Sequence, residues 1–184
     1  PKTNNFNSNG LGRLMDAVVC LITEERNGVY ELELQYPIDG ILCKDIKIAS
    51  IILAEPGEGR VLQPFSVYKI SKPLKGIITI HAEHISYQLS YIPCAPFTSQ
   101  TAAGALAGFE EHAAEECPYA FWTDKTTSGN FAVSVPASIR SRLGGVKGSI
   151  LDVYGGEFEF DRYTVRLWEN RGADNGVMLR YGKN

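Results

Sequence analysis

The stretch GSILDVYGGEFEFDRYTVRLW, residues 148–168, brings four acidic side chains close together in the sequence: Asp152, Glu157, Glu159 and Asp161. Such a group is either a catalytic centre or the polar side of a folded element. From residue 157 onward apolar and polar residues alternate, which is typical of a β-strand with one buried face. A second alternating run follows Asp161-Arg162, so these two residues are predicted to form the centre of a hairpin turn.

Burial decides the register of this predicted hairpin. Its pairing places Glu159 opposite Thr164, and it gathers one set of side chains on a single face: Phe158, Phe160, Tyr163, Val165 and Leu167. A slip by one residue would expose about five large side chains, each worth roughly 1.5–3 kcal/mol, whereas a cross-strand ion pair contributes about 0.2–1 kcal/mol. We therefore expect Glu157, Glu159, Thr164 and Arg166 to face solvent, outside any catalytic cleft.

Asp152 has a different predicted role. It follows Ser149 at the spacing of a capping box, in which the serine oxygen and the carboxylate each accept from a free amide at a helix start. Gly155 and Gly156 are then expected to end a short helix.

Residues 18–37, VVCLITEERNGVYELELQYP, contain the clearest hairpin signal in the chain. Asn27-Gly28 is the dipeptide that best fits a two-residue turn. Pairing outward from this turn predicts one face with Val19, Leu21, Thr23, Tyr30, Leu32, Leu34 and Tyr36. The other face is predicted to carry mainly Glu24, Arg26, Glu31, Glu33 and Gln35.

The remaining segments predict an α+β fold, mostly antiparallel β, with barrel-like domains and a few short helices. Strand patterns occupy residues 44–60, 65–89, 121–135 and 176–181. A helix is predicted over 98–116, capped by Thr98 or Ser99 and ended by Pro118, and a helical turn over 137–143. We expect three parts: a flexible lead-in (1–15), a β-rich subdomain (16–97), and a helix-plus-hairpin subdomain (98–184), incomplete at the C-terminus of a longer protein.

Composition excludes several classes of function. The chain has 184 residues, 44% of them apolar, which is enough for a core without disulfides. A formal net charge of −3 without a Lys/Arg cluster argues against stable nucleic-acid binding. The longest apolar run, around IASIILA, is too short to span a bilayer.

No residues are predicted to be catalytic or to bind a cofactor or metal. Cys20, Cys43, Cys94 and Cys117 are irregularly spaced and are expected to be free thiols. In HAEH, a strand would point His81 and His84 to opposite faces, so His84 is expected to be a hydrogen-bonded structural residue, and His112 cannot be placed near them. The sequence lacks a GxSxG elbow and a phosphate-binding glycine loop.

Five aromatic residues leave one alternative open. Most of this set is expected to pack in the core: Tyr91, Phe97, Tyr119, Phe121 and Trp122. An exposed strip of them would instead indicate binding of sugars or of a partner chain.

Longer stretches resemble a known family. ERNGVYELELQYP, AEHISY and LGGVKGSILDVYGGE are the strongest parts of a likeness that runs over nearly the whole chain. The sequence resembles the N-terminal region of phage minor structural proteins, the prophage endopeptidase tail or tail-associated lysin family of Gram-positive hosts. The resemblance implies a baseplate-hub fold, three copies in a ring that closes the tail tube, and no catalytic residues at these positions.

The same resemblance implies partners and a location. The implied partners are two further copies in a homotrimer, the distal tail protein, the tape measure protein and a receptor-binding or fibre protein. The implied location is the tail tip of a virion that is made in the host cytoplasm. The expected function is a structural tail component that supports host attachment. The alternatives are a peptidoglycan hydrolase, an activity that many family members carry in a C-terminal region, and a carbohydrate-binding module.

Overall fold

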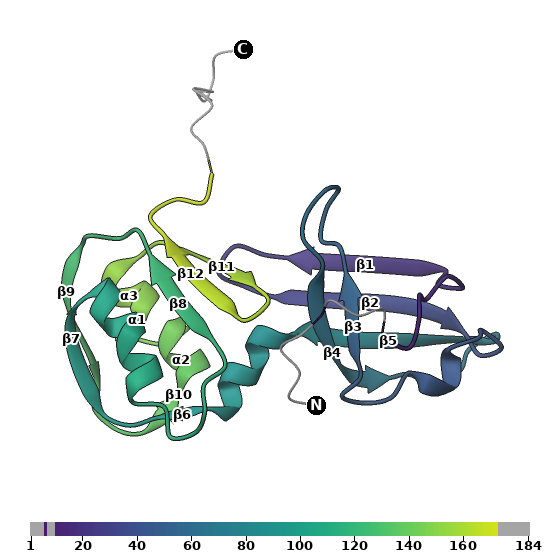
Figure 1. Cartoon of the computed structure of the whole chain (residues 1–184), viewed down its shortest axis with the longest axis horizontal. Helices are drawn as coiled ribbons and strands as arrows, with labels where there is room; N and C mark the ends of the chain where they lie inside the picture. Colours follow the sequence, from purple (N-terminus) through teal and green to yellow (C-terminus); the bar gives the residue numbers. More distant parts are fainter. Residues whose placement is uncertain (1–5, 7–9, 173–184) are drawn as a thin grey trace, which may run out of the picture.

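The computed structural model describes residues 6 and 10–172 and shows two halves lying side by side (Figure 1). The N-terminal half, residues 10–84, is a single curled sheet. The C-terminal half, residues 92–172, consists of smaller sheets around short helices. The 3-10 helix η2, Ile85–Tyr91, joins the halves, and the hairpin β11–β12 lies between them.

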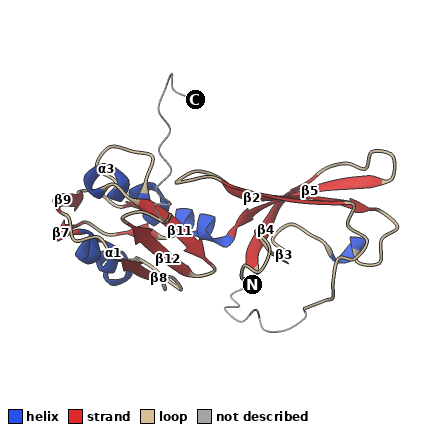
Figure 2. Cartoon of the chain, turned by 90° about the horizontal axis from the view of Figure 1, so that it is seen from above, coloured by secondary structure: helices blue, strands red, loops and turns tan. Residues whose placement is uncertain are grey.

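The N-terminal sheet has five antiparallel strands in the order β1-β2-β5-β4-β3. The strands are β1 Val19–Glu24, β2 Tyr30–Pro37, β3 Ile51–Ala54, β4 Gln63–Ile70 and β5 Ile77–His84, and a short 3-10 helix, η1 Cys43–Asp45, precedes β3. Burial alternates along β2 and β5. The sheet curls into a half-barrel (Figure 2), with a bulge in β4 between Val67 and Lys69. Its concave face holds a hydrophobic core that includes Tyr36, Phe65 and Ile80.

The predicted face of β1 is wrong. Glu25 and Val29 are joined by a backbone hydrogen bond of 2.8 Å, so three residues form the hairpin loop instead of two. Val19 therefore pairs with Gln35 and Leu21 with Glu33. The extra loop residue turns both apolar side chains to the outer face, where Leu21 is 57% exposed. The predicted burial of Tyr30, Leu32, Leu34 and Tyr36 is confirmed.

The C-terminal half contains seven strands and three helices among the described residues. They are β6 Pro93–Cys94, β7 Phe97–Thr101, α1 Ala102–Glu111, β8 Ala120–Thr123, β9 Ser128–Val133, β10 Ala137–Ser138, α2 Ile139–Leu143, α3 Ile150–Tyr154, β11 Glu157–Asp161 and β12 Thr164–Trp168. Three sheets form: β11-β12-β8, β7-β9 and β10-β6. Only the β12–β8 pairing in these sheets is parallel. A second hydrophobic core, with Leu106, Phe109 and Phe131, lies between sheets and helices.

The longest helix begins later and ends earlier than predicted, because it stops at Glu111, well before Pro118. Thr98 and Ser99 belong to β7, which pairs with β9, and the helix is capped by Thr101, whose hydroxyl accepts from Gly104 N at 3.1 Å. Strand pairing thus overrides the helical spacing of the first predicted turn. Leu106 and Phe109, two of the predicted core positions, are buried.

The second predicted hairpin has the right faces and the wrong turn. Its central residues are Arg162 and Tyr163, because Asp161 pairs with Thr164. Arg162 adopts a positive φ of 53°. Moving a turn by one residue moves each cross-strand partner by two, so the sorting of side chains is unchanged, and Phe158 lies opposite Leu167 on the buried face.

The α+β, mostly antiparallel fold is confirmed. The serine half of the capping box is confirmed, because Ser149 Oγ accepts from Asp152 N at 3.4 Å. The Asp152 carboxylate accepts from Gly148 N at 2.7 Å and not from the cap residue, whose N–H donates to Val146 O. The predicted subdomain boundary at residue 97 stays a prediction. The predicted last strand (176–181) and most of the lead-in lie outside the described residues.

Candidate functional site at the interface between the halves

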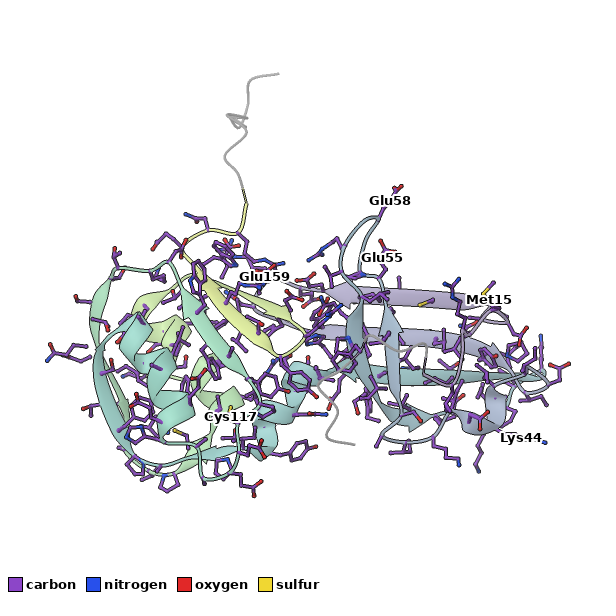
Figure 3. All side chains as sticks on the ribbon, viewed as in Figure 1. Met15, Lys44, Glu55, Glu58, Cys117 and Glu159 are labelled. Carbon is purple, nitrogen blue, oxygen red and sulfur yellow. The ribbon has the colours of Figure 1, made fainter. Side chains whose placement is uncertain are left out.

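Two acids of β11, Glu157 and Asp161, contact the N-terminal half, and the strand does not present its acids to open solvent as predicted. Figure 3 shows Glu159 between the halves, whereas Glu55 and Glu58 project from the β3–β4 loop. The Glu157 side chain is 15% exposed and the Glu159 side chain is 25% exposed. Sequence alternation identified the polar face correctly but could not show that another part of the chain covers it.

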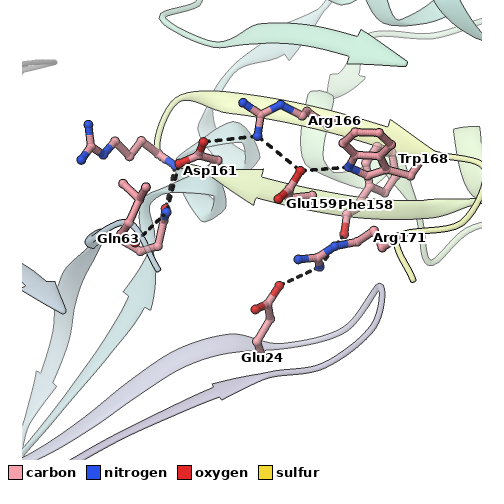
Figure 4. Close-up of polar contacts among 10 residues, drawn as sticks. Glu24, Gln63, Phe158, Glu159, Asp161, Arg166, Trp168 and Arg171 are labelled. Carbon is pink, nitrogen blue, oxygen red and sulfur yellow. Dashed lines mark hydrogen bonds and ion pairs between the residues drawn. The ribbon is translucent and has the colours of Figure 1, made fainter. Parts of the chain in front are cut away.

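Glu159 and Asp161 share one arginine (Figure 4). Arg166 Nη1 lies 3.3 Å from Glu159 Oε2 and 3.2 Å from Asp161 Oδ2. Trp168 Nε1 donates to the same Glu159 oxygen at 2.9 Å. Burial alone would raise the pKa of Asp161, but hydrogen bonds from Gln63 and Arg166 outweigh it and hold the pKa below its usual value. Asp161 is therefore suited to an ion pair and not to donating a proton near neutral pH.

A partly buried chain of hydrogen bonds connects Asp161 to the N-terminal sheet. Gln63 Nε2 donates to Asp161 Oδ1 at 3.0 Å, and Gln63 Oε1 accepts from Arg162 N at 2.7 Å. His84 Nε2 lies 3.2 Å from the same Gln63 oxygen, and His84 Nδ1 accepts from Ser86 N at 3.2 Å. Because Nδ1 accepts, the proton of the neutral ring is on Nε2, which donates to Gln63.

His84 is the structural, hydrogen-bonded histidine that was predicted. Its side chain is fully buried, and this burial, aided by the charge of Arg140, lowers its pKa to about 3. His81 lies on the outer face of β5, with Nδ1 4.0 Å from Glu33 Oε2. The two histidines therefore face opposite sides of the sheet. Among residues 6 and 10–172, no group of three or more His, Cys, Asp or Glu could hold a metal ion.

The tip of the first hairpin contacts the start of β11. Asn27 Nδ2 donates to Gly156 O at 3.0 Å, and Asn27 Oδ1 accepts from Phe158 N at 2.8 Å. Both bonds join residues more than a hundred positions apart. The sequence marked Asn27 as a turn residue, and nothing in the local pattern could reveal this second role.

Ion pairs surround the Asn27 contact. Glu24, at the end of β1, accepts from Arg171 Nη1 at 2.7 Å and from Arg60 Nη1 at 3.1 Å. Figure 4 shows Arg171 reaching Glu24 from the chain beyond β12. Arg26 Nη2 lies 3.0 Å from Glu157 Oε1. The interface therefore uses the charges of both halves to hold them together.

Arg140 of α2 is a further contact between the halves. Its Nη1 donates to Ser86 Oγ at 3.1 Å, and its guanidinium carbon lies 4.3 Å from the ring centre of Tyr87 and 4.9 Å from that of Phe160. Burial lowers the pKa of this arginine. A cavity of about 420 Å³ opens beside it, lined by residues of both halves.

The other candidates do not form a reactive site. Burial raises the pKa of the Cys117 thiol, which disfavours a thiolate nucleophile. The four cysteines are free, as expected. Tyr119 is buried and donates to Ile85 O at 2.6 Å, and Phe97 and Phe121 pack against the core. Tyr91 and Trp122 are exposed, so the five aromatics do not form one strip.

Comparisons with known proteins support the fold. No protein-family model matches the sequence, and no curated protein matches it either. One solved structure with a similar fold is the prophage tail protein gp18 from Listeria monocytogenes EGD-e, with a TM-score of 0.62 and 15% sequence identity. The match covers 94% of this chain and 50% of that protein, so the chain spans about half the length of gp18. The chain is thus similar in fold to a prophage tail protein, and the specific family named above stays a prediction.

Proposed function

We infer that the chain is a structural component of a phage or prophage tail. The observation that carries this inference is the similarity in fold to a prophage tail protein over 94% of the chain. The interface between the halves supports it, because the charged groups there bind one another. Such an arrangement suits a rigid building block.

We further propose that the chain forms part of a ring at the tail tip that closes the tail tube and supports host attachment. In the part of the chain that the structure describes, β1 and β3 are the edge strands of the N-terminal sheet, and their outer backbone groups could pair with neighbouring subunits. Three copies, with the distal tail protein, the tape measure protein and a receptor-binding or fibre protein as neighbours, are the partners we propose. A net charge of −3 fits a tube that passes DNA without binding it.

The tail assignment is tested by locating the protein in particles. An antibody raised against the purified chain should label one end of the tail in particles released from an induced host, as seen by electron microscopy. Light scattering of the purified chain at several concentrations tests the ring, for which a mass three times that of the monomer is expected. Particles whose tails carry no label would overturn the assignment.

We propose that residues 1–184 carry no catalytic activity. The low pKa of Asp161, the raised pKa of Cys117 and the neutral, buried His84 support this proposal, because none is poised for acid, nucleophilic or base chemistry. The purified chain should leave cell-wall peptidoglycan intact, as measured by release of soluble fragments. Turnover above the level of a heat-denatured sample would establish the alternative of a hydrolase.

A further inference from the structure

The cavity beside Arg140 lies where the two halves meet. The hairpin tip, η2, α2 and its following loop, α3 and β11 all contribute to its walls. The lining is mixed: Leu143, Leu151 and Phe158 are apolar, whereas Ser90, Ser138 and Ser141 are polar. Its volume of about 420 Å³ falls within the range of roughly 300–1,000 Å³ that is typical of small-molecule sites.

Arg140 forms no ion pair among the described residues, and neither does Arg162, whose Nε donates to Leu62 O. Arg26, Arg60, Arg166 and Arg171 each form an ion pair. Arg140 Nη1 donates to the neutral hydroxyl of Ser86. Glu83 acts on Arg140 only through longer-range charge.

A guanidinium taken out of water without an anion is unfavourable, and the lowered pKa of Arg140 reflects that cost. Tyr87 and Phe160 compensate in part, because aromatic rings attract a cation over their faces. Aromatic rings that contact the face of a guanidinium leave the N–H groups at its edge available to polar partners. Arg140 is one of the residues that line the cavity.

We propose that this cavity binds the carboxylate of a small organic acid through the N–H edge of Arg140. The planar fork of a guanidinium matches a carboxylate with two parallel hydrogen bonds. Of the described residues that line the cavity, Arg140 is the one that carries a charge, which favours a singly charged carboxylate over a doubly charged phosphate. The apolar lining residues suit a short hydrocarbon tail on the acid.

The binding test uses the folded chain and nuclear magnetic resonance at constant ionic strength. Butyrate, acetate and inorganic phosphate are titrated separately, with chloride as the balancing salt. We expect saturable shifts at the Arg140 Nε–H and at the amides of Ser141 and Gly145, with butyrate binding more tightly than acetate and phosphate binding more weakly than either. Shifts that stay linear with all three anions would overturn the proposal, and tighter binding of phosphate would overturn the choice of a carboxylate.

Two matched substitutions on the same helix assign the site. Arg140→Lys keeps the charge but loses the two-pronged contact, and should weaken butyrate binding about tenfold or more. Arg142→Lys, two residues further along α2 and not part of the cavity wall, should leave the affinity unchanged. Equal affinity in both variants would contradict the assignment. If Arg140→Lys does not fold, the shifts mapped on the unmodified chain decide the question.

Discussion

The two hairpins β1–β2 and β11–β12 carry the same sequence signals and respond differently to an error in the turn. In both, the turn residues differ from those predicted. The faces of β11–β12 survive because its turn keeps two central residues and moves by one position, which shifts each cross-strand partner by two. In β1, the run VCLIT has apolar side chains on both faces, so burial favours neither face strongly. The length of the hairpin loop then determines which face of β1 is buried. Alternation therefore fixes the buried face only where the opposite face is clearly polar.

The largest expected difference in the free energy of unfolding comes from truncating one leucine in each hairpin. Leu167 of β12 is fully buried, whereas Leu21 of β1 is 57% exposed. Leu167→Ala should lower the free energy of unfolding by about 2–5 kcal/mol, because it leaves a cavity in the second core. Leu21→Ala should change it by less than about 0.5 kcal/mol. Urea unfolding followed by tryptophan fluorescence measures both, and a comparable loss for Leu21→Ala would restore the register predicted from the sequence.

The next prediction concerns the pH dependence of stability due to His84, which binds the side chain of Gln63 that holds the turn of β11–β12 against the N-terminal sheet. His84 has a pKa of about 3 in the folded chain and about 6.5 when unfolded. The unfolded chain therefore binds a proton first as pH falls, so the stability due to neutral His84 is complete above pH 6.5 and declines toward pH 3. Between pH 7 and pH 5 the free energy of unfolding should fall by about 2 kcal/mol.

A substitution of His84 separates its contribution to the pH dependence of stability from that of other titrating groups. His84→Gln removes the titrating ring and keeps a hydrogen-bonding side chain, so it should be less stable at pH 7 but should lose little stability between pH 7 and pH 5. His81→Gln, on the outer face of the same strand, is the matched control and should retain the full decline. Glu24 and Asp161 have lowered pKa values and add to the acid sensitivity only at lower pH. An unchanged slope in His84→Gln would show that another group is responsible.

Sequence reasoning went furthest where local chemistry decides the structure. Alternation gave the buried faces of β2 and β11–β12, and the Ser149 and Asp152 spacing gave the helix cap. It failed where a distant segment decides, as at Thr98 and Ser99, which pair with β9 instead of starting the helix. The interface between the halves lies wholly in this second class. The partners of Gln63, Asn27 and Arg140 are set by tertiary contacts that leave no local pattern.

Asn27 offers a smaller effect that separates its two roles. It has a positive φ of 54°, which glycine adopts freely, and its side chain forms two hydrogen bonds to the start of β11. Asn27→Gly keeps the backbone conformation and should cost about 1–2 kcal/mol through the lost bonds. Asn27→Asp keeps the acceptor for Phe158 N and should cost less. Thermal unfolding ranks the variants, and a neutral Asn27→Gly would mean that the contact between hairpin and β11 contributes nothing.

The smallest effect concerns the ion pair beside that contact. The Arg26 side chain is 71% exposed and pairs with Glu157 at 3.0 Å. An exposed arginine loses side-chain freedom when it pairs and is screened by salt, so Arg26→Ala should cost less than about 0.5 kcal/mol, and the difference should vanish in high salt. Glu157 would still accept from Arg171 N at 3.3 Å, so it is not left without a partner. A loss larger than that of Asn27→Gly would mean that charge, and not the amide of Asn27, joins the first hairpin to the second.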